Sequence, residues 1–383
     1  MKNISILINS MAGGGAERVV SILLEEFRIN YNVTLVVMGS ESSHFLPKNI
    51  NIRYLNKQSS SKNSIMKLIE LPILAYKYKS FCKLNKIDKS FSLLSRSNYI
   101  NILSKVLFRN KAKTIVSERG TPSMYYGYNN LQSKINKFLI KLLYPLADLI
   151  ITNSCGNKND LIKNFNIKKN IISIPNPINI KMIEKFASEN VDFNNDKFTF
   201  VTIGRLDQGK NHELMIDALA EINLKDVQLI IIGEGELMTH LKEKVSRLKM
   251  QDKVSLFGFD SNPYKYLSKS DCFVFTSNYE GFPNVLVEAL ACELPVISTD
   301  CLSGPREILA PNTNINLQEK NNVEYSKYGI LIPVKDKVNL KKAMKSIIEN
   351  ENMRTEYVNK AKIRAFDFEK GDIITKYIEA IEA

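Results

Sequence analysis

Short apolar runs alternate with amphipathic stretches along the chain, and this alternation limits the folds open to it. In the first part, AERVVSILLEEF has the periodicity of a helix, and strands are predicted at ISILIN, NVTLVVMG, INIRYLN, KTIVSE and DLIITNS. Repetition of strand, turn and helix is typical of a parallel sheet wound by helices on both faces.

The pattern stops and then restarts, which divides the chain. From Ile171 to Lys197 the prolines and asparagines of IISIPNPIN and NVDFNNDK indicate a connector, with a candidate hinge at Pro175–Pro177. After it, strands are predicted at FTFVTIG, VQLIIIGEG, KVSLFGF, CFVFTS, PVIST and YGILIPV. A length of 383 residues exceeds one ordinary core, so we expect two α/β domains at 1–175 and 176–367 with a cleft between them.

Composition excludes several classes of protein. With 44% hydrophobic and 24% charged residues the chain is globular. Its five cysteines are scattered and contain no CxxC pair, which argues against a disulfide framework or a zinc ribbon and favours the cytoplasm. The first twenty residues lack a signal-peptide core, and no run of eighteen apolar residues predicts a membrane span.

The net charge of +13 is concentrated in the first half. From Arg53 to Arg119 there are fifteen Lys or Arg residues against three acids. Such a segment suits a nucleic acid, an anionic bilayer or a lipid diphosphate, although a solvated lysine-rich surface is the alternative. Within it, the basic amphipathic stretch 63–84 (NSIMKLIELPILAYKYKSFCKL) suits an anionic leaflet, or else a core helix with a solvated rim.

Glycines follow several predicted strands. Gly13, Gly14 and Gly15 lie between the first strand and its helix, where backbone N–H groups can meet a phosphate, unless they only make a tight turn. NAD is disfavoured, because the second strand ends in Gly39–Ser40 with Glu41 only loosely placed. Gly233 and Gly235 would permit the approach of a ring or a ribose.

Charged residues follow two further strands. In IGRLDQGKN, Arg205 and Lys210 can converge on one diphosphate, or they are an ordinary surface pair. In NYEGFPNVLVEAL, Glu288 can accept hydrogen bonds from vicinal ribose hydroxyls, and Glu280 lies nearer the reacting sugar. The alternative is a carboxylate favoured by the helix dipole and a loop acid.

GGAERVV, GRLDQGKN, GEGEL, FGF and EGFPNVLVEALACELPVISTD, in this order, resemble the retaining glycosyltransferases of family 4 (GT4). That family has the GT-B fold of two facing Rossmann-like, doubly wound domains. LPILAYKYK, NKFLIKLLYPLADLI and GFDSNPYKY are similar to bacterial enzymes that add N-acetylgalactosamine to undecaprenyl-diphosphate-linked oligosaccharides. The resemblance implies transfer from a nucleotide-sugar donor, UDP-N-acetylgalactosamine by preference, in polysaccharide or glycan assembly. It also implies a C-terminal helix, 368–383, that packs back on the first domain.

Carried over to this sequence, the resemblance makes Arg205 and Lys210 the diphosphate clamps, Glu288 the ribose ligand and Glu280 the acid that positions the donor sugar. It adds donor-binding positions, mostly on glycine turns and at one helix start: Gly14, Gly15, Gly204, Glu234, Phe257, Gly281, Phe282, Pro283, Asn284 and Val285. Many relatives carry a histidine after a Ser-Glu pair. Here SERGTP has Arg119, so Glu118 and Arg119 are candidates on the sugar side.

No metal and no cofactor are expected. The sequence has no Asp-x-Asp, and His44, His212 and His240 lack ligand partners at metal spacing. The implied partners are a nucleotide-sugar, a lipid-linked oligosaccharide and the inner face of the cell membrane. The alternatives are a nucleotide-sugar epimerase of the same fold and a nucleic-acid-binding protein, the latter disfavoured because Trp, RNP-like aromatics and zinc fingers are absent.

Overall fold

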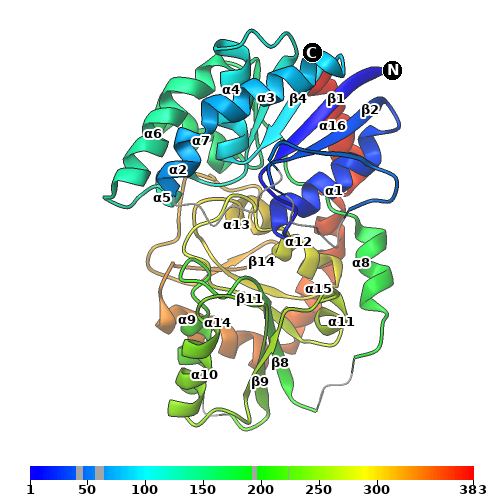
Figure 1. Ribbon diagram of the computed structural model, residues 1–383. Helices are drawn as coiled ribbons and strands as arrows, with labels where there is room; N and C mark the ends of the chain where they lie inside the picture. Colours follow the sequence, from blue (N-terminus) through cyan, green and yellow to red (C-terminus); the bar gives the residue numbers. More distant parts are fainter. Residues whose placement is uncertain (40–45, 57–63, 192–195, 223) are drawn as a thin grey trace. The chain divides into compact units, whose positions relative to one another are not determined.

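The computed structural model describes residues 1–39, 46–56, 64–191, 196–222 and 224–383, and it divides into two compact units (Figure 1). Unit 1 is Met1–Pro177 with Lys370–Ala383, and unit 2 is Ile178–Glu369. The predicted boundaries fall two residues before these divisions. Ser40, Glu41 and His44, which the sequence analysis considered, lie outside the described residues.

Unit 1 contains a seven-stranded parallel sheet in the order β3-β2-β1-β4-β5-β6-β7. Its strands are β1 Lys2–Ile8, β2 Tyr31–Val37, β3 Asn51–Tyr54, β4 Lys89–Leu93, β5 Lys113–Glu118, β6 Leu149–Thr152 and β7 Ile171–Ser173. Strand β7 lies in the segment IISIPNPIN that was interpreted as a connector, and β4 was not predicted, because its KSFSL sequence has no clear apolar run. Its buried Ser90 and Ser92 hydroxyls donate to Asn101 and Asn98, respectively, so polar side chains fill this part of the interior with their hydrogen bonds satisfied.

Helices cover both faces of this sheet. They are α1 Gly15–Phe27, α2 Ser64–Ile69, α3 Leu71–Leu84, α4 Ser95–Val106, α5 Pro122–Tyr125, α6 Leu131–Leu143, the 3-10 turn Tyr144–Leu146, α7 Cys155–Phe165 and α16 Lys370–Glu382. One core joins the sheet to α3, α4 and α6, and the other joins it to α1 and α16 (Figure 1). The structure therefore has the predicted doubly wound arrangement.

The C-terminal helix α16 is fixed to unit 1 at both ends. Lys370 pairs with Glu26 at 2.5 Å, and Glu382 pairs with Lys2 at 2.5 Å. Between these ends Tyr377 is fully buried against the sheet. A helix that follows unit 2 in sequence thus completes the core of unit 1, as the resemblance implied.

Unit 2 contains a second seven-stranded sheet in the order β10-β9-β8-β11-β12-β14-β13, with β13 antiparallel to β14. Its strands are β8 Phe198–Ile203, β9 Val227–Ile232, β10 Val254–Gly258, β11 Cys272–Phe275, β12 Val296–Thr299, β13 Glu324–Ser326 and β14 Gly329–Ile332. The parallel strands coincide with the predicted runs, whereas the short polar edge strand β13 was not predicted.

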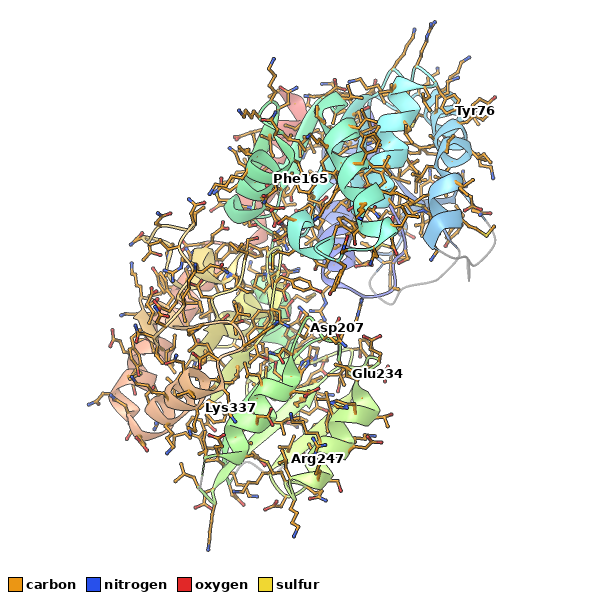
Figure 2. The ribbon with its side chains drawn as sticks, turned by 90° about the vertical axis from the view of Figure 1, so that its left-hand side faces the viewer. Tyr76, Phe165, Asp207, Glu234, Arg247 and Lys337 are labelled. Carbon is orange, nitrogen blue, oxygen red and sulfur yellow. The ribbon has the colours of Figure 1, made fainter. Side chains whose placement is uncertain are left out.

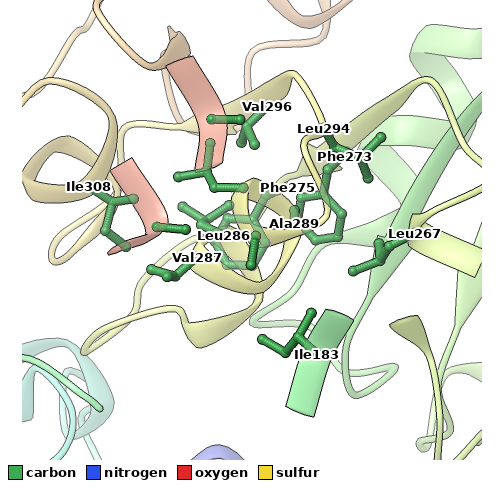
Figure 3. Packing of buried hydrophobic residues seen from close by; sticks show 14 of the residues in the cluster. Ile183, Leu267, Phe273, Phe275, Leu286, Val287, Ala289, Leu294, Val296 and Ile308 are labelled. Atoms are coloured by element: carbon green, nitrogen blue, oxygen red, sulfur yellow. The ribbon is translucent and has the colours of Figure 1, made fainter. Parts of the chain in front are cut away.

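Eight helices are described for unit 2: α8 Ile180–Ala187, α9 His212–Ala220, α10 Met238–Arg247, α11 Tyr264–Leu267, α12 Asn284–Ala291, α13 Pro305–Leu309, α14 Lys337–Glu349 and α15 Glu351–Phe366. In one core, Phe273 and Phe275 of β11 pack with Leu286 and Ala289 of α12 (Figure 3). This burial fixes α12 on the sheet directly after β11. Among the described helices, none is both long enough and apolar enough to cross a bilayer.

The loops after β8 and β9 interlock through two glycines. A Cβ on Gly233, which has φ 143°, would lie 2.0 Å from the Gly204 carbonyl oxygen, and one on Gly235 would lie 2.3 Å from the Leu206 carbonyl oxygen. The Leu206 N–H donates to the Glu234 carbonyl at 2.9 Å. Glycine is therefore required at both positions for the packing of the two loops, and the approach of a ligand there stays a prediction.

Replacing Gly235 with Ala should destabilise unit 2 by about 1–3 kcal/mol, since the backbone of the loop after β8 must move to accept the methyl group. The urea midpoint of the variant should fall. Gly371→Ala is the matched control, because nothing lies within 4 Å of a Cβ there. Equal midpoints for Gly235→Ala and the wild type would contradict the interlock.

Candidate functional site

The sheet of unit 2 reverses its strand order between β8 and β11, so the loops after these two neighbouring strands leave in opposite directions. Open α/β sheets bind ligands at such a point. The two loops are joined by the Asn278 N–H, which donates to the Gly209 carbonyl at 2.8 Å, and by the Thr276 hydroxyl, which donates to the Lys210 carbonyl at 3.0 Å. The motifs GRLDQGKN and NYEGFPN, 70 residues apart, thereby form one surface.

Lys210 and Glu280 meet across this junction. The Lys210 Nζ lies 2.5 Å from the Glu280 Oε1 and 5.3 Å from the centre of the Phe275 ring. The lysine side chain is 27% exposed and the glutamate side chain 11% exposed. A cation held by an aromatic face and one carboxylate, yet open to solvent, can exchange that carboxylate for another anion.

Other predicted residues lie on the loops after β8 and β9. Arg205 is exposed just after β8, beside the Gly204 turn. Figure 2 shows Asp207 and Glu234 close together, consistent with the hydrogen bond between the Leu206 and Glu234 backbones. Glu234 is exposed after β9.

Phe257, on β10, presents an aromatic side chain at the next strand of the sheet. It is 42% exposed, and its ring lies 5.2 Å from that of Tyr266. The next residue, Gly258, has φ 76°, which favours glycine. A partly exposed ring in a fixed position can stack on a flat ligand.

The loop before α12 is held by a second loop. The Glu280 N–H donates to the Leu302 carbonyl at 2.8 Å, and the Ser303 hydroxyl donates to the Gly281 carbonyl at 2.8 Å. Phe282 packs edge-on against Phe368 with ring centroids 5.3 Å apart. The backbone from Glu280 to Phe282 is thereby fixed.

Helix α12 begins at Asn284 after Pro283, which offers no side-chain cap to the first N–H groups. The N–H groups of Asn284 and Val285 belong to the first turn, where the helix dipole favours an anion. Glu288 follows Asn284 by four positions, so the two share one face of the helix. Glu288 is 3% exposed and lies in the second turn.

A network of ion pairs lies in the segment after β12, next to the loop that carries Glu280. It was not predicted from the sequence. Arg306 Nη2 lies 2.5 Å from Asp300 Oδ2 and 2.7 Å from Glu324 Oε2. Asp300 also accepts the Glu319 N–H at 2.6 Å. These residues follow β12 and join it to β13, which places Leu302 and Ser303 against the Glu280 loop. In the sequence, Asp300 follows a predicted strand and Arg306 lies near the start of a predicted helix. Nothing in the sequence indicates that both belong to a network with Glu324.

The histidines described in unit 2 have separate surroundings. His212 is buried at the start of α9, and burial together with the neighbouring Lys210 charge lowers its pKa to about 3. It is therefore neutral at neutral pH. His240 is hydrogen-bonded to Glu213 at 2.6 Å on the surface. Among the described residues no group of three or more His, Cys, Asp or Glu side chains is arranged to hold a metal ion.

In unit 1, the glycine turn precedes α1. Gly13 has φ 99°, Gly14 is the N-cap and Gly15 is the first helical residue. A Cβ on Gly14 would lie 2.6 Å from the Glu17 carboxylate, so this helix start has an acid directly beside it. Whether Gly14 and Gly15 meet a phosphate stays a prediction.

Glu118 and Arg119, at the end of β5, are both buried. The Glu118 carboxylate accepts hydrogen bonds from the Tyr144 hydroxyl at 2.5 Å and from the Arg119 N–H at 3.0 Å. Burial raises the pKa of Glu118, and these hydrogen bonds oppose the rise. The Arg119 guanidinium donates to Asn176 and, at 3.2 Å, to Tyr377. Arg119 thus donates hydrogen bonds to the connector and to α16 in unit 1. The resemblance had implied a different role for this position, on the side of the sugar.

Comparison with known proteins agrees with this arrangement. The family "Glycosyltransferase Family 4" matches residues 13–181, and "Glycosyl transferases group 1" matches residues 184–364. The chain is 40% identical over 374 residues to a Campylobacter jejuni protein named N-acetylgalactosamine-N,N'-diacetylbacillosaminyl-diphospho-undecaprenol 4-alpha-N-acetylgalactosaminyltransferase, and 97% of each chain is covered.

A second C. jejuni protein, a GalNAc-alpha-(1->4)-GalNAc-alpha-(1->3)-diNAcBac-PP-undecaprenol alpha-1,4-N-acetyl-D-galactosaminyltransferase, is 26% identical over 389 residues, covering 100% of this chain and 98% of its own. Among solved structures, the Anabaena HepE complex with UDP and glucose is similar in fold, with a TM-score of 0.81, 18% identity and full coverage of both chains. With two parallel-sheet units, matches to both halves and a relative 40% identical along nearly its whole length, the chain is a glycosyltransferase of family 4 with the GT-B fold.

Proposed function

We propose that this glycosyltransferase transfers N-acetylgalactosamine from UDP-N-acetylgalactosamine onto an undecaprenyl-diphosphate-linked oligosaccharide, with retention at the anomeric carbon. The observation that carries the proposal is the junction at the reversal of the β8 and β11 strands, where Lys210 and Glu280 meet beside the start of α12. The relative that is 40% identical, whose name states this donor sugar and this lipid carrier, supports the choice of substrates.

The proposed donor contacts follow from the charge of the site. Lys210 and Arg205 neutralise the diphosphate as negative charge grows on it, and first-turn N–H groups of α12 bind its terminal phosphate. Glu288 accepts two hydrogen bonds from the ribose, and Phe257 stacks on the base. Glu280 exchanges its contact with Lys210 for one with the donor sugar.

The proposed chemistry needs no protein nucleophile. The bond between the anomeric carbon and the diphosphate oxygen breaks, and the acceptor hydroxyl oxygen bonds to the same face of that carbon. The acceptor's proton passes to the departing phosphate oxygen. Because Lys210, Arg205 and helix N–H groups supply the positive charge, we propose that neither a metal nor another cofactor takes part.

The acceptor and its membrane are proposed to lie on the side of unit 1. Helix α3 buries Leu74 and Tyr78 but exposes Ile73 and Tyr76, 60% and 55% respectively. Figure 2 shows Tyr76 on the outer side of unit 1. The same helix carries Lys77, Lys79 and Lys83 toward solvent, at least in part. One face of the helix therefore belongs to the core, and the other presents apolar and cationic groups.

We propose that this outer surface, Ile73, Tyr76, Lys77, Lys79 and Lys83, binds the inner face of the cell membrane peripherally. Exposed apolar side chains beside lysines suit the boundary of an anionic leaflet, with about 1 kcal/mol per well-placed lysine. Lys89 and Arg119 belong to the basic excess of the sequence but are buried, so they contribute nothing to such a surface.

The proposed reaction predicts transfer of radiolabelled N-acetylgalactosamine from its UDP donor to a detergent-dispersed undecaprenyl-diphosphate oligosaccharide. Because fixed cations replace a metal, the rate should be unchanged after dialysis against EDTA. Epimerised donor formed without acceptor would favour the epimerase, and loss of activity on chelation would contradict the metal-independent site.

Lys210→Ala and Glu288→Gln should each lower kcat/KM by at least about 100-fold, because each removes a proposed charged contact to the donor. Donor affinity should be measured separately by calorimetry with UDP, which should weaken for both. Glu243→Gln, on the exposed face of α10, is the control. Wild-type rates in either site variant would reject its assignment.

Reversing the charges of Lys77, Lys79 and Lys83 to Glu should release the protein from anionic liposomes while donor hydrolysis stays unchanged, since the change of six charges affects only the outer side of α3. The matched control is Lys249, Lys342 and Lys345 to Glu, three exposed lysines of unit 2. Equal sedimentation of both triple variants with the liposomes would contradict the proposed surface.

A further inference from the structure

Unit 1 has its own reversal of strand order, between β1 and β4, and a cavity opens beside it. The cavity measures about 360 Å³, at the small end of ligand pockets. Its lining includes Asn9 after β1, Ser95 after β4 and Glu118 after β5, three strand ends that adjoin in the sheet. All of its lining residues belong to unit 1, and they include Glu118 and Arg119.

The aromatic residues around this cavity have fixed positions. The Tyr99 hydroxyl donates to the Asn136 side chain at 3.1 Å, and the Tyr126 hydroxyl donates to Ser95 at 3.2 Å. Asn136 in turn donates to the Gln132 carbonyl at 2.8 Å. With their hydroxyls bound, the two tyrosines are held in place and leave ring surface for an apolar contact.

Two arginines of the wall, Arg96 and Arg119, each bury an Nε without a partner among the described residues, and Arg96 is the one whose side chain is held there by a single long ion pair. Its buried Nε has no hydrogen-bond partner in the part of the chain that the structure describes, and its Nη2 lies 3.5 Å from Glu70, a long contact. A buried donor without an acceptor is costly, and such groups ordinarily bind water or a ligand. Arg96 lines the cavity from the first turn of α4, and Lys67 lies at the same cavity.

The lining offers a sugar both apolar surface and hydrogen-bonding groups. Tyrosine rings and leucines provide apolar surface for a sugar ring, whereas amides and Arg96 bind its oxygens. The wall also carries three cationic side chains, Lys67, Arg96 and Arg119, against the single carboxylate of Glu118, so an anion is the competing ligand that the test must exclude. An acetamido group adds a strong carbonyl acceptor for Arg96 and a methyl group for the apolar wall.

We propose that this cavity binds an N-acetylated sugar of the acceptor oligosaccharide and that Arg96 recognises it by donating to the acetamido oxygen. This inference rests on the proposed function for the identity of the acceptor, and it names the residue that gives the acceptor side its specificity. The role proposed for Arg96 is binding of the acceptor.

Binding is tested with methyl α-N-acetylgalactosaminide as the probe, by saturation-transfer NMR in the presence of excess UDP. Wild type should saturate the acetamido methyl and ring protons of the probe, and Arg96→Gln should reduce this signal about 10-fold. Arg28→Gln removes the same charge from the exposed end of α1, away from the cavity, and should retain the signal. Methyl α-galactoside, which lacks the acetamido group, should bind weakly to all three proteins.

Two further measurements separate a local effect from misfolding. Gln132→Trp fills the cavity from an exposed position on α6, and it should remove the signal while the thermal midpoint stays at the wild-type value. With the lipid-linked acceptor, Arg96→Gln should raise the acceptor KM about 10-fold and leave UDP binding and donor hydrolysis unchanged.

An unchanged probe signal in Arg96→Gln, or its displacement by inorganic pyrophosphate, would overturn the proposal. Arg96-dependent binding of the probe in a protein that transfers no sugar to the lipid-linked acceptor would support the cavity and contradict the proposed function. The failure of one is therefore distinguishable from the failure of the other.

Discussion

The contact between Lys210 and Glu280 depends on the order of the strands in unit 2. Because β8 and β11 are neighbours whose connections leave in opposite directions, loops 70 residues apart in sequence approach each other there. A pair that is about a quarter exposed on the lysine side contributes little to stability, about 0–1 kcal/mol. Its replacement by a contact between Lys210 and a doubly charged ligand consequently costs little, and the cation is already held in place.

The rigidity that such a site requires comes from its surroundings. Gly233 and Gly235 let two loop backbones touch, and Ser303 fixes the carbonyl of Gly281. Behind them the buried guanidinium of Arg306 binds both Asp300 and Glu324. Breaking this buried network would leave a charge without a partner, which is far more costly than losing the exposed pair. Stability and ligand exchange are thus assigned to different ion pairs.

How far the sequence could predict this structure depended on the kind of interaction. Apolar runs identified most parallel strands, but β4 was missed because Ser90 and Ser92 are buried through hydrogen bonds to asparagines of α4, a pairing that periodicity does not detect. Glycine turns and strand ends drew attention to Lys210 and Glu280, which the fold brings into contact, and their roles toward a donor stay predictions. Their direct contact could not be predicted, because it is set by the spatial order of the strands, which the local pattern leaves open.

Arg119 and Arg96 illustrate the same limit. The sequence drew attention to Arg119 because a histidine stands there in many relatives, and in the structure its guanidinium donates to Tyr377 and Asn176, whereas its buried Nε has no partner among the described residues. Arg96 had no sequence signal beyond its place in a basic segment. It becomes notable only when the folded chain buries its Nε beside a cavity without providing an acceptor. A sequence motif can thus mark the place of an arginine at a strand end. Only the folded structure shows which of its N–H groups are buried without an acceptor, and such groups are candidates for binding a ligand.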